Sequence, residues 1–200
     1  MEASAPIGPH IEPEPLEWQP RASWVGARLL CGAVTFFFMA FLFAYFYLRS
    51  LNVNKAWKIG AVNPSIGLGV AIVVVLILSA AALRLATRRP ASDLRLATAS
   101  LVLALAAIVL QVVEWTTLGF GGVSGGYASV FIGWTAMYLV FALFSLYWIE
   151  TQVATIWRTR RQGPGPSPAG ISAANLEACS FFWAFYVGIG VLAFVVLYLV

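Results

Sequence analysis

The sequence has little charge, one histidine and two cysteines. Charged residues make up 10% of the 200 residues, against about 25% in soluble domains. The single imidazole is His10, outside every long apolar run, and Cys31 and Cys179 lie in separate runs. These residues cannot form a disulfide framework, or a haem, copper or zinc site, within the apolar part of the chain.

Catalytic patterns are also missing. The chain has no Ser-His-Asp set, no pair of closely spaced carboxylates, and no glycine-rich loop between a strand and a helix. We therefore expect no catalytic centre, no cofactor site and no metal site in this chain.

Long apolar runs dominate what is present, since 61% of the residues are hydrophobic. A helix needs about 20 apolar residues to cross the hydrocarbon core of a bilayer. Five runs reach this length, which predicts an all-α integral membrane bundle of five transmembrane helices. The predicted spans are residues 24–49, 68–87, 97–118, 127–157 and 178–200.

Two polar segments flank or interrupt the apolar runs. Residues 1–23 hold five of the ten prolines and four of the eight acidic residues, which predicts a flexible arm outside the membrane. Residues 24–200 form the membrane domain. Within it, residues 158–175 are rich in glycine and proline and predict a linker. A second glycine-rich stretch, 119–126, predicts a flexible turn rather than a phosphate cradle.

The distribution of basic residues predicts the orientation. With the N-terminus inside, nine arginines fall on the cytoplasmic side, and Arg49, Lys55 and Lys58 remain outside. The positive-inside rule therefore favours N-terminus in and C-terminus out, which places the arm and the linker in the cytoplasm. Because the basic residues sit at span ends, they indicate attraction to anionic lipid and not nucleic-acid binding.

Three carboxylates lie in or beside the predicted spans. Glu114 shares a helical face with Gln111, three residues earlier, and precedes Trp115 at interfacial depth. Glu114 either reaches headgroup water or anchors a lipid headgroup, a neighbouring subunit or the glycine-rich stretch. We expect Glu150 to be a solvated or locally paired surface residue, and Glu177 to cap the start of the last span.

Several segments, taken in order, resemble subunit III of haem-copper terminal oxidases. The strongest match is Leu110-Gln111-Val112-Val113-Glu114-Trp115, followed by Gly126-Tyr127-Ala128-Ser129-Val130-Phe131 and then Thr135. Further matches are the aromatic stretch 42–50, Asn63-Pro64, Glu177-Ala178-Cys179-Ser180-Phe181-Phe182-Trp183 and Leu197-Tyr198-Leu199. The resemblance covers about residues 24–200 and is closest to the short, five-helix bacterial form.

Some polar residues of that family pattern are missing. Its carboxylate in the first helix falls on Val34 or Thr35, and its two histidines fall on Tyr138 and Phe141. The His and Asp of its last helix fall on Ala184 and Val187. The resemblance therefore implies a divergent member that keeps the scaffold, and whether the missing groups abolish a proton-uptake role stays open.

The resemblance implies a non-redox accessory subunit of a respiratory cytochrome c oxidase in a bacterial plasma membrane. Haem and copper would lie in the catalytic subunit I, and this chain would bind phospholipids in a cleft between its first two helices and the rest. The residues predicted to contact lipid or a partner subunit are Gln111, Glu114, Trp115, Tyr127, Glu177 and Trp183.

Two alternatives stay open. The chain could be a similar partner of a quinol oxidase or nitric oxide reductase, since the donor and acceptor sites of such complexes lie in other chains. A small transporter or channel is the alternative from another class. Transporters, however, commonly have broken helices or charges at the bilayer midplane, which this sequence lacks.

Overall fold

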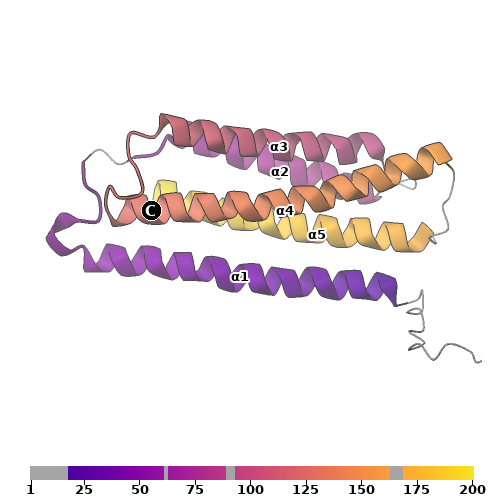
Figure 1. The fold of residues 1–200 in the computed structure, drawn as a ribbon, viewed down its shortest axis with the longest axis horizontal. Coiled ribbons are helices and arrows are strands. Elements are labelled where there is room, and N and C mark those ends of the chain that lie inside the picture. Colours follow the sequence, from indigo (N-terminus) through magenta and orange to yellow (C-terminus); the bar gives the residue numbers. More distant parts are fainter. Residues whose placement is uncertain (1–17, 61–62, 89–92, 163–168) are drawn as a thin grey trace, which may run out of the picture.

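The computed structural model describes residues 18–60, 63–88, 93–162 and 169–200, which contain five long helices and no strand (Figure 1). All five helices are long and apolar enough to cross a membrane. The predicted all-α five-span architecture is confirmed at this level, while its orientation stays a prediction. The helices are α1 (Gln19–Leu51), α2 (Ile66–Arg88), α3 (Leu94–Thr117), α4 (Gly126–Gln162) and α5 (Ala169–Phe194).

Two short elements complete the described chain. The 3-10 turn η1 (Val53–Lys55) follows α1, and α5 continues into the π-helical turn η2 (Val195–Leu199). The start of α1 and the C-terminus lie at opposite ends of the bundle (Figure 1). We call the end that holds the C-terminus, the segment 52–60 and the loop 118–125 the C-terminal end of the bundle.

Several helix boundaries differ from the predicted ones. Helix α1 begins at Gln19 instead of residue 24, with Pro20 in its first turn, where the missing N–H costs nothing. Helix α4 continues to Gln162 and α5 begins at Ala169, so residues 158–162 and 169–175 of the predicted linker are helical. Apolar composition marks only the part of a helix that suits hydrocarbon, and these helices continue into polar sequence. Residues 163–168, and 1–17 of the predicted arm, lie outside the described residues.

Helices α2 and α3 form the antiparallel hairpin that the short connection between them favours. The surface of α3 that faces the bundle carries small buried side chains, among them Ala97, Ala104 and Ala107. Small residues let helix backbones approach closely in a membrane, where apolar burial adds no driving force. The Ser79 hydroxyl of α2 donates to the Ser100 carbonyl of α3 at 2.8 Å and holds the pair together.

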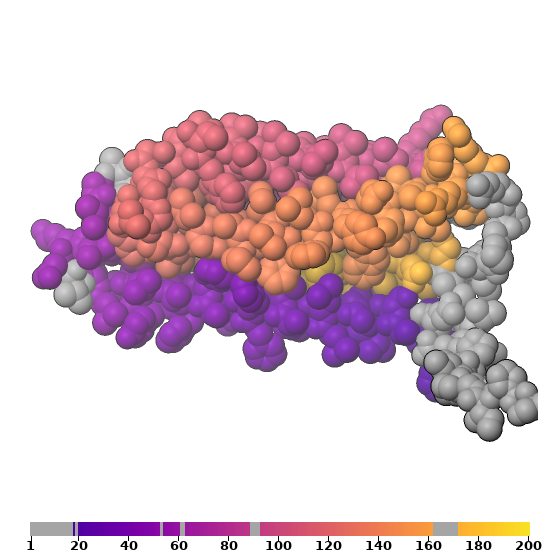
Figure 2. All heavy atoms as spheres, viewed as in Figure 1, coloured from indigo at the N-terminus to yellow at the C-terminus, as the bar shows by residue number. Residues whose placement is uncertain are grey.

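Helix α5 is the central helix, packing against α1, α2 and α4. In the space-filling view it is visible only as a narrow yellow strip between α1 and α4 (Figure 2). Helix α1 packs on α5 and α4, whereas α2 packs on α3 and α5. The first two helices therefore do not pack together as one unit, and the lipid cleft that the resemblance implies stays a prediction.

The glycine-rich loop is held in place by backbone contacts with the segment after α1. The N–H groups of Gly126 and Tyr127 donate to the carbonyls of Ala56 and Trp57 at 3.1 and 2.9 Å. Gly125 has a φ of +108°, and a Cβ there would lie 2.9 Å from the Ala56 carbonyl oxygen. Glycine is therefore required for this close approach, and the stretch is more than the flexible turn that the sequence predicts.

Candidate functional site

The most polar part of the bundle interior is built around Glu114, one turn before the end of α3. Its side chain is 0% exposed. The Glu114 Oε2 atom accepts hydrogen bonds from Gln111 Nε2 at 2.9 Å and from the Tyr198 hydroxyl at 2.6 Å. The predicted shared face with Gln111 is confirmed, but the alternative in which Glu114 reaches headgroup water is wrong because α3 turns it into the bundle.

Tyr198 reaches Glu114 from the π-helical turn η2 at the end of the chain. A π-turn widens a helix by one residue and shifts the side chains that follow it, and here the Val200 N–H meets the Val195 carbonyl at 3.2 Å. The ring lies over Gly69 of α2, where a Cβ would come within 2.6 Å of Tyr198 Cε1. The widened helix and the lack of a side chain at Gly69 together let the Tyr198 ring enter the bundle.

The same turn is fixed from two other helices. The Tyr127 hydroxyl of α4 donates to the Leu197 carbonyl at 2.6 Å. Arg49 of α1 donates to the Val200 carbonyl at 2.7 Å. The last carbonyls of a helix have no partner within it, so these donors satisfy groups that hydrocarbon could not. Tyr127 thus acts inside the chain, as a support for the turn that carries Tyr198.

Trp115 follows Glu114 but faces α4. Its indole N–H donates to the Thr135 hydroxyl at 3.0 Å, and that hydroxyl donates to the Phe131 carbonyl at 2.8 Å. The Trp115 ring is only half-buried, so it joins α3 to α4 and also keeps outward-facing surface.

Trp183 forms a second polar centre further along the bundle. Its indole N–H donates to the Ser79 hydroxyl at 3.0 Å, and that hydroxyl lies 3.1 Å from the Ser100 hydroxyl. Three helices, α5, α2 and α3, therefore meet in one group of hydrogen bonds. We call Trp183, Ser79 and Ser100 the serine–tryptophan group.

Glu177 does not have its predicted role. Because α5 begins at Ala169, Glu177 lies inside the helix and does not cap its start. Its side chain is exposed. Near this end of the bundle, a hydrogen bond between Ser23 and Asn175 joins α1 to α5. Glu150 is exposed on α4, as expected of a surface residue.

The six predicted contact residues therefore divide into two groups. Glu114, Gln111, Tyr127 and Trp183 are buried among the helices of this chain, so their side chains bond to other parts of the same chain. Trp115 and Glu177 have exposed surface, and contact with lipid or a partner subunit stays a prediction for them.

Tyr138 is part of the site although the sequence did not single it out as a site residue. It stacks on Tyr186 with ring centroids 4.5 Å apart and an interplanar angle of 13°. Each hydroxyl donates to the other's backbone carbonyl, that of Tyr138 at 3.3 Å. Tyr138 is one of the positions at which the family pattern has histidine. At this position, two stacked aromatic rings therefore stand where the resemblance predicts a histidine.

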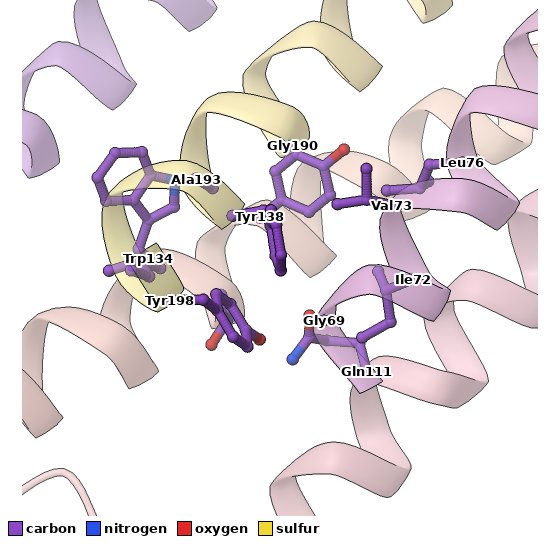
Figure 3. A pocket seen from close by; sticks show the side chains of 13 residues that line it. Gly69, Ile72, Val73, Leu76, Gln111, Trp134, Tyr138, Gly190, Ala193 and Tyr198 are labelled. Atoms are coloured by element: carbon purple, nitrogen blue, oxygen red, sulfur yellow. The ribbon is translucent and has the colours of Figure 1, made fainter. Parts of the chain in front are cut away.

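A cavity is lined by this tyrosine and by Gln111 and Tyr198, the two residues that donate hydrogen bonds to Glu114 (Figure 3). Its volume is about 30 Å³, and Gln111, Tyr138 and Tyr198 extend towards it from three different elements. Gly190 of α5 also lines it, and a Cβ there would lie 2.5 Å from the Tyr138 hydroxyl oxygen. The space is far too small for a substrate, so the site suits packing and polar bonding between helices.

Substitution of Gly190 tests this packing. Gly190→Ala should displace the Tyr138 hydroxyl and lower the free energy of unfolding by about 1–3 kcal/mol, the usual cost of overpacking. Gly188→Ala is the matched control on the same helix, because a Cβ there meets nothing within 4 Å. Unfolding in detergent, followed by circular dichroism, measures both. Equal stability of the two variants would contradict the packing described.

In the comparison with known proteins, no family model matches the chain, and no curated protein matches it significantly.

Proposed function

We propose that this chain is a non-redox accessory subunit of a respiratory haem-copper oxidase, similar to subunit III of cytochrome c oxidase. It binds phospholipids and stabilises the catalytic subunit I, which carries the haem and copper. The chain is then a component of an oxygen-reducing, proton-translocating complex in aerobic electron transport. It has no catalytic residues of its own in this proposal.

The observation that carries the proposal is the meeting of separate parts of the family pattern at one site. Glu114 and Gln111 belong to its strongest segment, and Tyr198 belongs to its last segment, 84 residues later in the chain. Trp115 similarly bonds to Thr135, which belongs to the segment after the glycine-rich loop. We expect a divergent member of a family to keep the residues that hold its fold together.

The surface of the bundle suits a subunit surrounded by lipid and other helices. Large apolar side chains point outwards along its helices, including Phe36, which is 82% exposed, and Phe144, which is 70% exposed. With the N-terminus inside, as the basic residues favour, the C-terminal end of the bundle faces away from the cytoplasm of a bacterial plasma membrane. Trp115 and Glu177 are the predicted contact residues available at the surface.

The transporter alternative has less support. Two cavities between the described helices measure about 30 and 20 Å³, which is room for water but not for a larger solute. A larger pocket of about 220 Å³ lies at the C-terminal end of the bundle, beside Asn52, Trp57 and Gly126. Glu114 lies one turn from a helix end and is bonded to neutral partners. A partner subunit of a quinol oxidase or nitric oxide reductase would need the same fold. Only the redox groups that co-purify with the chain distinguish that alternative from a cytochrome c oxidase.

Purification in mild detergent tests the proposal. A tagged copy of the full chain, extracted from its native membrane, should co-purify with a haem-containing subunit. A reduced-minus-oxidised spectrum and metal analysis for copper then identify the complex. Recovery of haem and copper with oxygen-reducing activity supports a terminal oxidase, whereas recovery of haem and non-haem iron without copper supports the nitric oxide reductase alternative. Recovery of the chain without any haem protein would overturn the proposal.

A further inference from the structure

Two small cavities lie between the helices of the bundle. The first, of about 30 Å³, is lined by residues of α2, α3, α4, α5 and η2. The second, of about 20 Å³, is lined by residues of α2, α3, α4 and α5. Four residues line both, namely Ile72, Leu76, Gln111 and Tyr138, so the two spaces are adjacent. A cavity needs about 10–15 Å³ to hold one water, so each is large enough.

The first cavity is lined mainly by apolar residues, with a few polar groups among them. Trp134 lines it, and its indole nitrogen is buried with no acceptor in reach among the described residues. Gln111, Tyr138 and Tyr198 bring an amide and two hydroxyl groups to the same wall. A buried water is normally held by two to four such groups, whereas purely apolar cavities of this size stay dry. The unpaired N–H and the cavity are independent observations, and both indicate water.

The second cavity continues towards the serine–tryptophan group. Trp183 lines it and donates its indole N–H to Ser79, which bonds in turn to Ser100. At the other end, Gln111 bonds to Glu114. Ser100 and Glu114 are 14 residues apart on α3, which corresponds to about 21 Å along the helix axis. Polar groups and cavities thus alternate over much of a membrane's thickness.

We propose that water binds in both cavities. The bound waters join these side chains into one hydrogen-bonded network inside the bundle, which extends from Glu114 to the serine–tryptophan group. Trp134, Gln111 and Tyr138 are the principal side chains that bind this water. This proposal is independent of the proposed function, since it rests on the interior of this chain alone. Water there supplies the hydrogen bonds that neighbouring helices do not, and it makes this membrane domain wet inside.

Hydroxyl-radical footprinting in water enriched in oxygen-18 tests the proposal. Radiolysis of a bound water oxidises the side chains beside it even when bulk solvent cannot reach them. The full chain is used as extracted from its membrane, with the subunits it retains. Trp134 and Trp183, which are 0% and 1% exposed, should be oxidised several-fold more, relative to their rates in the unfolded chain, than Tyr127. Tyr127 is 1% exposed and lines neither cavity.

A pair of alanine substitutions on α3 separates water from packing. Ala107→Val fills part of the second cavity. It should reduce the oxidation of Trp183 several-fold and leave the oxidation of Trp134 unchanged. Ala97→Val, at a buried position that lines neither cavity, should change neither. If either variant fails to fold, the wild-type pattern alone decides. Protection of Trp134 and Trp183 equal to that of Tyr127 would overturn the proposal.

Discussion

Glu114→Ala should destabilise the bundle more than any other single substitution of a carboxylate in the chain. The change removes the acceptor of both Gln111 and Tyr198 and leaves two buried donors unpaired. Each unpaired donor costs about 1–3 kcal/mol, so the free energy of unfolding should fall by about 3 kcal/mol or more. Unfolding in detergent micelles, followed by circular dichroism, measures the loss.

The exposed carboxylates of the same membrane domain supply the controls. Glu150→Ala and Glu177→Ala alter surface residues and should change stability by less than about 0.5 kcal/mol. Glu114→Gln keeps an acceptor oxygen and should lie between these variants and Glu114→Ala. A double-mutant cycle of Glu114→Gln with Tyr198→Phe should give a coupling of about 1 kcal/mol. A Glu114→Ala variant as stable as Glu150→Ala would show that the buried hydrogen bonds contribute nothing.

Gly69→Ala should have the second-largest effect, because it acts on the same contact from α2. The added Cβ would lie 2.6 Å from Tyr198 Cε1 and 2.9 Å from Phe194 Cε2, so the tyrosine ring must move off the helix. Overpacking costs about 1–3 kcal/mol, and loss of the Tyr198–Glu114 hydrogen bond adds to it. The free energy of unfolding should therefore fall by about 2–4 kcal/mol.

Gly67→Ala, two residues earlier on α2, is the matched control. A Cβ at Gly67 meets only Ser65 Oγ, at 3.9 Å, and the position is exposed. Alanine favours helix over glycine by about 1 kcal/mol, so this variant should be neutral or slightly stabilised. Since the helix-propensity gain is common to both, the difference between the variants isolates the overlap with Tyr198. Equal stabilities would contradict the placement of that ring.

The sequence predicts the architecture well because hydrocarbon imposes a simple requirement. Every span needs about 20 apolar residues, and all five predicted spans are helical in the structure. The errors lie at the helix ends, where α1 and α5 begin earlier than apolar composition indicates. Helical hydrogen bonding continues into polar sequence, so composition alone cannot locate a helix end.

The candidate site is only partly predictable. The spacing of Gln111 and Glu114 places them on one helical face, and their hydrogen bond follows from local geometry. The contact with Tyr198 depends on the π-turn and on the absence of a side chain at Gly69, neither of which has a local sequence signal. The same limit applies to Glu177, whose role as a helix cap fails because the helix begins eight residues earlier.

The lifetime of the proposed oxidase complex during turnover tests the central claim most directly. Oxygen consumption is followed with the complex purified from the native membrane, with a complex lacking this chain, and with one carrying Glu114→Gln. The account predicts equal initial rates, with faster inactivation and less retained phospholipid when the chain is absent. Glu114→Gln weakens hydrogen bonds inside the bundle and should give intermediate inactivation. Identical inactivation kinetics and lipid content in all three preparations would contradict a stabilising subunit.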